Sequence, residues 1–200
     1  MIKIGITGSI SSGKTTASQI LSYKRGSLFS ADAVVNKLYK KIYFKKLLKR
    51  KFNIKQRNLK ETLKKIMLQD SKQVKKLEKL IHPLVRKEMK KFSINNQRKK
   101  IVFYEIPLLI ESNLIKYFDI IIFIKAKKKI RLNRFLDKGG EKKIFNLLNK
   151  RQFSDIKKAK FADHIVVNEK TLNTLKKNLS GIINQYVSGF FRYGNNRPIF

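Results

Sequence analysis

The sequence contains no cysteine and is poor in acidic residues, with 13 Asp+Glu against 48 Lys+Arg. Without cysteine the chain has no disulfides, no thiolate metal sites and no cysteine nucleophile. Its longest apolar runs, 106–110 and 120–124, are much shorter than the roughly 20 residues that a membrane helix needs. We therefore expect no membrane association. The N-terminus runs directly into a strand-like segment, which predicts no signal peptide and a cytoplasmic protein.

The formal net charge of +35 by itself indicates a polyanionic partner such as nucleic acid, a membrane surface or a phosphorylated ligand. The cations, however, are 38 Lys and only 10 Arg, accompanied by 25 Ile and 15 Asn. This composition is typical of proteins from AT-rich genomes, and the lysines are spread along the whole chain. We interpret most of the charge as compositional and expect no specific nucleic-acid partner.

Short apolar segments with strand character alternate with helical patterns. The strand-like segments are 2–7, 27–30, 101–105, 119–125 and 164–168. This alternation predicts an α/β fold with a parallel sheet and helices on both faces. We expect a core formed by 1–35 and 96–188, a helical insert at 36–95, a lid at 136–155 and a loose tail at 189–200. Proline cannot donate the helical hydrogen bond, so Pro83 predicts a break or kink within the insert.

Residues 8–15 match the phosphate-loop pattern G-x-x-x-x-G-K-[ST] between a strand and a helix. Glycines in such a loop let successive backbone N–H groups point at phosphate oxygens, and the following helix adds its positive end. Lys14 is predicted to reach the β- and γ-phosphates, and the Thr15 hydroxyl to ligate Mg²⁺. The predicted nucleotide-binding residues are Gly8, Ser9, Ile10, Ser11, Ser12, Gly13, Lys14, Thr15 and Thr16.

The chain is long enough for a nucleotide-binding core and one small acceptor-binding insert, which favours a small-molecule kinase. Such an enzyme needs a carboxylate that orients or deprotonates the attacking hydroxyl. Asp32 follows the second strand-like segment at the sheet edge where ligands bind in open α/β folds. Asp32 also suits the N-cap of the next helix, and the sequence leaves both roles open.

Several further stretches resemble one family, the dephospho-coenzyme A kinases. The resemblance rests on the opening GITGSISSGKTT, Ser30-Ala31-Asp32, Leu77-Glu78 with the IHPLVR stretch that begins at Ile81, EIPLLIE at 105–111 and ADHIVVN at 162–168. It covers roughly 1–180, with 36–60 poorly matched. It implies a three-layer P-loop nucleotide-kinase fold with a parallel five-stranded sheet, a helical acceptor-binding insert and a small lid.

The resemblance also implies a reaction: phosphorylation of the 3′-hydroxyl of dephospho-coenzyme A with ATP and Mg²⁺, the last step of coenzyme A synthesis. Lys14 and Asp32 are then the expected catalytic residues, with Asp32 as base and Thr15 as the metal ligand. Residues expected around the acceptor are Asp32, His82, Pro83, Arg86, Glu105, Pro107 and Leu108, and the lid cations are Arg134, Lys138 and Arg151. Gln152 and Lys158 also align with family positions, near the adenine and the lid hinge.

The chain departs from the family at Ser30, which replaces an aspartate, in the glycine-poor loop, and at Lys138, where the family usually has arginine. Two alternatives therefore stay open: a nucleoside monophosphate kinase or another small-molecule kinase of the same fold, and a basic nucleic-acid-binding protein on a kinase-like fold. The second lacks an aromatic-rich RNA motif and an arginine cluster. We expect a monomer or a small homo-oligomer.

Overall fold

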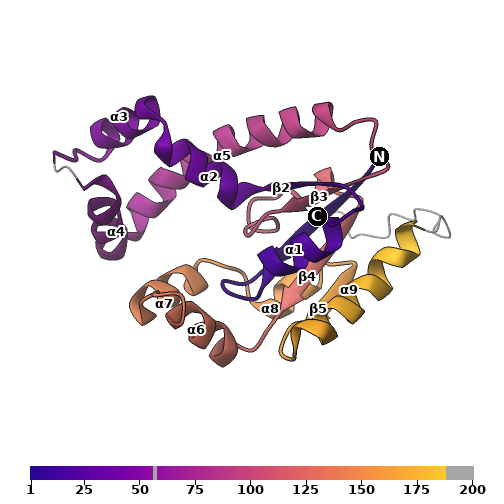
Figure 1. The fold of residues 1–200 in the computed structure, drawn as a ribbon. Helices are drawn as coiled ribbons and strands as arrows, with labels where there is room; N and C mark the ends of the chain where they lie inside the picture. Colours follow the sequence, from indigo (N-terminus) through magenta and orange to yellow (C-terminus); the bar gives the residue numbers. More distant parts are fainter. Residues whose placement is uncertain (56–57, 188–200) are drawn as a thin grey trace. The chain divides into compact units, whose positions relative to one another are not determined.

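A computed structural model describes residues 1–55 and 58–187 of the chain. The described part of the chain divides into two compact units (Figure 1): Met1–Ser30 together with Asn96–Val187, and Ala31–Asn95. The tail predicted at 189–200 lies outside the described residues. Within the described ranges, no helix has the length and hydropathy of a membrane span.

The first unit is built on a five-stranded sheet in the order β2-β3-β1-β4-β5. The strands are β1 (Ile2–Gly8), β2 (Ser27–Ser30), β3 (Ile101–Glu105), β4 (Ile120–Lys125) and β5 (His164–Val167). Every neighbouring pair is parallel. The prediction of a parallel five-stranded α/β sheet is confirmed. Strands β1, β3 and β4 are buried almost throughout, as strands covered on both faces require.

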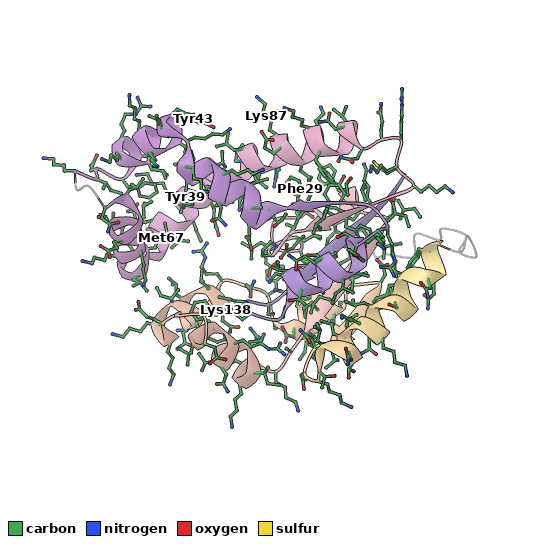
Figure 2. All side chains as sticks on the ribbon, viewed as in Figure 1. Phe29, Tyr39, Tyr43, Met67, Lys87 and Lys138 are labelled. Carbon is green, nitrogen blue, oxygen red and sulfur yellow. The ribbon has the colours of Figure 1, made fainter. Side chains whose placement is uncertain are left out.

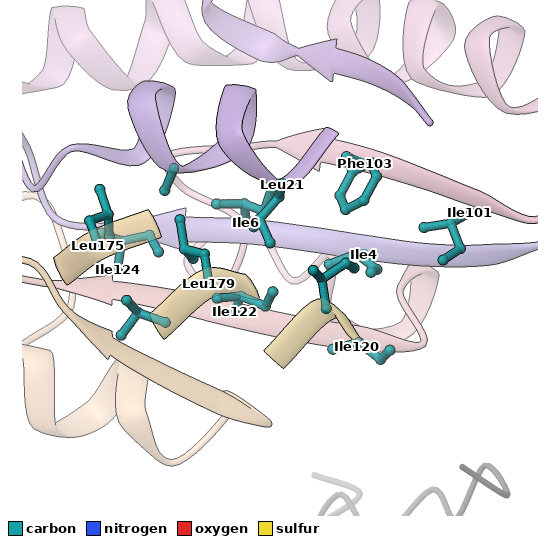
Figure 3. Close-up of a cluster of buried hydrophobic side chains, with 13 residues drawn as sticks. Ile4, Ile6, Leu21, Ile101, Phe103, Ile120, Ile122, Ile124, Leu175 and Leu179 are labelled. Atoms are coloured by element: carbon teal, nitrogen blue, oxygen red, sulfur yellow. The ribbon is translucent and has the colours of Figure 1, made fainter. Parts of the chain in front are cut away.

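One face of the sheet is covered by α1 (Lys14–Ser22) and α9 (Leu172–Val187). Their buried leucines, among them Leu21 and Leu179, pack on the isoleucines of the central strands (Figure 3). On the other face lies the connection between β3 and β4, which includes the short η1 (Ile115–Tyr117). A Cβ atom at Gly5 would lie 2.6 Å from Leu109 Cδ1 and 3.0 Å from Phe118 Cγ. The close packing of this connection therefore requires glycine in the middle of β1.

The remaining helices of the first unit follow β4. They are α6 (Lys128–Leu136), α7 (Lys142–Lys150) and α8 (Asp155–Ala159), and α8 contacts β4. Helices α7 and α8 are separate, and the Ser154 hydroxyl accepts a hydrogen bond from Lys157 N and caps α8. The cap lies within residues 152–155, of which Gln152 and Asp155 contact the phosphate loop.

The second unit is helical. It consists of α2 (Ala31–Lys40), α3 (Ile42–Lys51), α4 (Leu59–Gln69) and α5 (Ser71–Asn95), and α2 and α4 both pack against α5. Its core combines aromatic and aliphatic side chains from all four helices, including Leu38, Phe44, Leu63 and Ile81. The unit thus has an apolar core of its own despite its many lysines.

Of the break or kink predicted at Pro83, the break is wrong: α5 runs from Ser71 to Asn95 with the proline inside. A proline in a helix interior costs about 3 kcal/mol. Apolar side chains on both sides of it, Leu77 and Ile81 before and Leu84 after, belong to the core of the second unit. Burying each such side chain contributes about 1.5–3 kcal/mol, so packing outweighs the lost hydrogen bond.

Candidate active site

The phosphate loop joins the end of β1 to the start of α1 and has the backbone that the motif requires. Gly13 precedes α1 with φ 94°, and Ser11 has φ 56°. A Cβ atom at Gly13 would lie 2.2 Å from Asn168 Nδ2, and one at Gly8 would lie 2.5 Å from Ile124 O. Both motif glycines are therefore needed for conformation or close approach. Ser11 holds the left-handed conformation without being glycine, which costs roughly 1–3 kcal/mol.

Donors for an anion gather at the start of α1. No side chain caps the helix at Gly13, which leaves the first N–H groups and the positive end of the helix for a ligand. Lys14 is buried, and its Nζ donates to Ser9 O at 3.1 Å. Ser12 Oγ is buried and has no hydrogen-bond partner among the described residues. A phosphate group fits this set because it would accept from backbone, ammonium and hydroxyl donors together.

Glu105, at the end of β3, lies beside the loop and is almost completely buried. The Thr15 hydroxyl donates to its Oε1 at 2.5 Å, and the Ser18 hydroxyl lies 3.4 Å from its Oε2. Mg²⁺ prefers oxygen ligands and usually keeps water and substrate phosphates in its shell. Threonine and glutamate oxygens side by side fit such an ion. The described residues contain no cluster of three or more His, Cys, Asp or Glu side chains that would form a larger metal site.

The outer side of the loop is held by side chains from the α6–α8 region. Ile10 N donates to Gln152 Oε1 at 2.7 Å, and the Ser9 hydroxyl donates to Asp155 Oδ1 at 2.6 Å. Arg131, buried on α6, lies with Nη1 3.4 Å from Ile10 O and 2.8 Å from an Asn149 oxygen. Burial lowers the pKa of Arg131, and Asp155 partly opposes that shift.

A buried ion pair anchors this region. Lys158 Nζ lies 3.0 Å from Glu111 Oε1, with the two side chains 0% and 9% exposed. The same carboxylate accepts a hydrogen bond from Phe153 N at 2.9 Å. Burial lowers the pKa of Lys158, while Glu111 opposes the shift. The EIPLLIE stretch thus contributes Glu105 to the phosphate loop and Glu111 to the support of residues 152–158.

Replacing Glu111 with glutamine should destabilise the protein by about 3–5 kcal/mol, because it leaves the buried Lys158 ammonium without its counter-charge. Urea unfolding measures the loss. Combining Glu111→Gln with Lys158→Met should restore most of the stability, since no uncompensated charge then remains. Equal stability of the Glu111→Gln protein and the native protein would contradict a charged pair at this position.

The expected lid cations belong to the first unit. Arg134 lies on α6, Arg151 follows α7, and exposed Lys138 lies in the turn between those helices (Figure 2). Arg134 Nη1 is buried and has no hydrogen-bond partner in the described part of the chain. Figure 2 shows side chains that end in nitrogen on the helices of both units.

The other expected residues divide between the units. Pro107 O accepts a hydrogen bond from the Thr7 hydroxyl, and Leu108 follows it in the first unit. Asp32 lies in the first turn of α2, in the second unit. The helix begins at Ala31, so Asp32 is not the N-cap residue that the sequence also allowed. His82, Pro83 and Arg86 lie on α5, which packs against α2.

Sequence reasoning assigned no role to Asn168, Asp155 or Arg131. Asn168 follows β5 and donates from Nδ2 to Ser12 O at 2.9 Å, so it fixes the carbonyl just before Gly13. Its position after a parallel strand, at the same sheet edge as the loop, was a usable signal. Asp155 and Arg131 had no such signal, because their contacts to the loop span more than 100 residues of sequence.

Comparison with known proteins agrees with this geometry. Residues 2–174 match the sequence profile of a family described as dephospho-CoA kinase. A dephospho-CoA kinase from Bartonella quintana is 38% identical to this chain, and the match covers 90% of this chain and 95% of the relative. A dephospho-CoA kinase from Rickettsia typhi is 32% identical, and the match covers 92% of this chain and 96% of the relative. The structure of a dephospho-CoA kinase from Campylobacter jejuni is 23% identical in sequence and has a TM-score of 0.66, and the match covers 94% of this chain and 98% of that one. The structure of a shikimate kinase from Acinetobacter baumannii is 15% identical in sequence, and the match covers 96% of each chain with a TM-score of 0.56. This likeness shows a shared fold.

Proposed function

Because the chain belongs to the dephospho-coenzyme A kinase family, we propose that it transfers the γ-phosphate of ATP to the 3′-hydroxyl of dephospho-coenzyme A. The hydroxyl oxygen bonds to the γ-phosphorus, the bond from that phosphorus to the β-phosphate oxygen breaks, and ADP leaves. The hydroxyl proton passes to a carboxylate. The observation that carries the proposal is the phosphate loop, in which the Thr15 hydroxyl donates a hydrogen bond to Glu105 Oε1 at 2.5 Å.

The loop residues hold the nucleotide. The N–H groups at the start of α1 and Lys14 Nζ bind the β- and γ-phosphates and stabilise the charge that moves between them. Thr15 and Glu105 would hold Mg²⁺, which neutralises phosphate charge when bound. The direct hydrogen bond between their side chains keeps both oxygens in place before the nucleotide arrives.

Asp32 is the proposed base. The chain passes from the end of β2 straight into α2, so Asp32 follows the carboxyl edge of the sheet by two residues. His82 and Arg86 are four residues apart and share one face of α5, the helix that packs against α2. They are the proposed acceptor contacts of the insert at 36–95, together with Pro83, and Pro107 and Leu108 are those of the core.

Residues 136–155 are the proposed lid. Arg134, Lys138 and Arg151 supply its cations and lower the charge on the transferring phosphoryl group. Lys138 acts there as a point charge and cannot form the two parallel hydrogen bonds of an arginine. The proposed setting is the cytoplasm, with the chain acting as a monomer or a small homo-oligomer.

An acceptor screen tests the function. Purified protein with MgATP should form ADP when dephospho-coenzyme A is added, and it should leave nucleoside monophosphates unphosphorylated. The product should be coenzyme A, identified by its mass. Turnover with a nucleoside monophosphate and none with dephospho-coenzyme A would overturn the proposal. Nucleic acid should be released steeply as salt rises, as from any strongly cationic surface.

A further inference from the structure

The phosphate loop carries backbone strain at a serine. Ser11 lies in the left-handed region with φ 56°. Glycine adopts this conformation freely, whereas a residue with a Cβ atom populates it only when neighbouring contacts hold it there. The loop has no glycine between Gly8 and Gly13. None of the residues between them can therefore adopt the left-handed conformation without a cost in free energy.

The contacts that hold Ser11 act on the residue just before it. The Ile10 N–H donates to Gln152 Oε1 at 2.7 Å, and the Ile10 carbonyl lies 3.4 Å from Arg131 Nη1. Both polar groups of this peptide residue are thereby fixed from outside the loop. The shorter of the two contacts comes from Gln152.

Gln152 is itself held in position. The next residue, Phe153, donates its backbone N–H to Glu111 Oε1, which also pairs with buried Lys158. Two residues after Phe153, Asp155 accepts a hydrogen bond from the Ser9 hydroxyl. The segment 152–155 therefore contacts the loop at two consecutive residues and is fixed to the core between those contacts.

We propose that Gln152 is a positioning residue that fixes Ile10 and thereby holds strained Ser11 in the conformation that binds the ATP phosphates. It acts through the loop backbone, by accepting the hydrogen bond from Ile10 N. In this glycine-poor loop, the Gln152 amide supplies the restraint that offsets the preference of serine for other conformations. The inference rests on the nucleotide-binding part of the proposed function and is independent of the acceptor.

The first experiment needs no nucleotide. Methionine matches glutamine in length but its sulfur is only a weak acceptor, so Gln152→Met removes the hydrogen bond and keeps the volume. Amide hydrogen exchange at Ile10 should become roughly tenfold faster in this variant. Gln19→Met, at an exposed glutamine of α1, is the matched control and should leave that rate unchanged. Unchanged exchange at Ile10 in Gln152→Met would overturn the proposal.

The second experiment is a double-mutant cycle with Ser11→Gly, read as the equilibrium Kd for MgATP by titration calorimetry. In the native background, Gln152→Met should weaken MgATP binding about tenfold. In the Ser11→Gly background the same change should weaken binding only about twofold, because glycine adopts the required conformation unaided. A purely structural role of Gln152 predicts the same weakening in both backgrounds, and that result would overturn the proposal. Failure of the acceptor screen would leave both readouts intact, so the two proposals can fail separately.

Discussion

Replacing Asp32 with asparagine should lower kcat about 10²–10⁴-fold, the usual contribution of a general base, while the Kd for MgATP stays unchanged. Asparagine has nearly the same shape but cannot accept the hydroxyl proton. Asp32 also lies in the first turn of α2, where an acidic side chain contributes about 0.3–1 kcal/mol to helix stability. Single-turnover transfer to dephospho-coenzyme A and calorimetric MgATP binding separate the two effects.

Glu61 offers a matched control for this substitution. It lies in the first turn of α4, in the same unit as Asp32, and its loss also removes one negative charge. Glu61→Gln should leave kcat within about twofold of the native value, since exposed substitutions rarely have larger effects. Full activity of Asp32→Asn would remove Asp32 as the base and reduce its role to helix stability.

The sheet and the phosphate loop could be predicted because both depend on local sequence. The runs at 101–105 and 120–124 are apolar at nearly every position, which only a strand covered on both faces needs, and the structure buries them accordingly. The loop follows from glycine and lysine at fixed spacing, and the structure shows both glycines in positions where a Cβ atom would clash.

The supports of the loop could not be predicted, since they join distant parts of the chain. Gln152 reaches Ile10 across 142 residues, and Lys158 pairs with Glu111 across 47. The family resemblance marks Gln152 and Lys158 as shared positions, but the sequence does not show what these side chains contact, and only the structure pairs buried Lys158 with Glu111. The absence of a break at Pro83 has the same origin: a local rule predicted a break or kink, and the tertiary packing of Leu77 and Ile81 keeps the helix continuous.

Replacing Lys14 with methionine should lower kcat about 10²–10³-fold, because the site loses a positioned cation that stabilises charge in the transition state. The native Lys14 is buried, and its Nζ is held 3.1 Å from Ser9 O. Methionine fills a similar volume, so the melting temperature should change little. Steady-state kinetics with saturating dephospho-coenzyme A measure the effect.

Lys177→Met provides the control that this cationic chain requires. Lys177 is exposed on α9, and its loss changes the net charge of +35 by the same single unit. If the overall positive field captured the nucleotide, the two variants would lose activity equally, and the loss would shrink in salt for both. We expect a loss for Lys14 alone that persists at high salt, because its ammonium acts at short range from a buried position. Equal losses would assign nucleotide handling to the bulk charge of the protein and not to the loop.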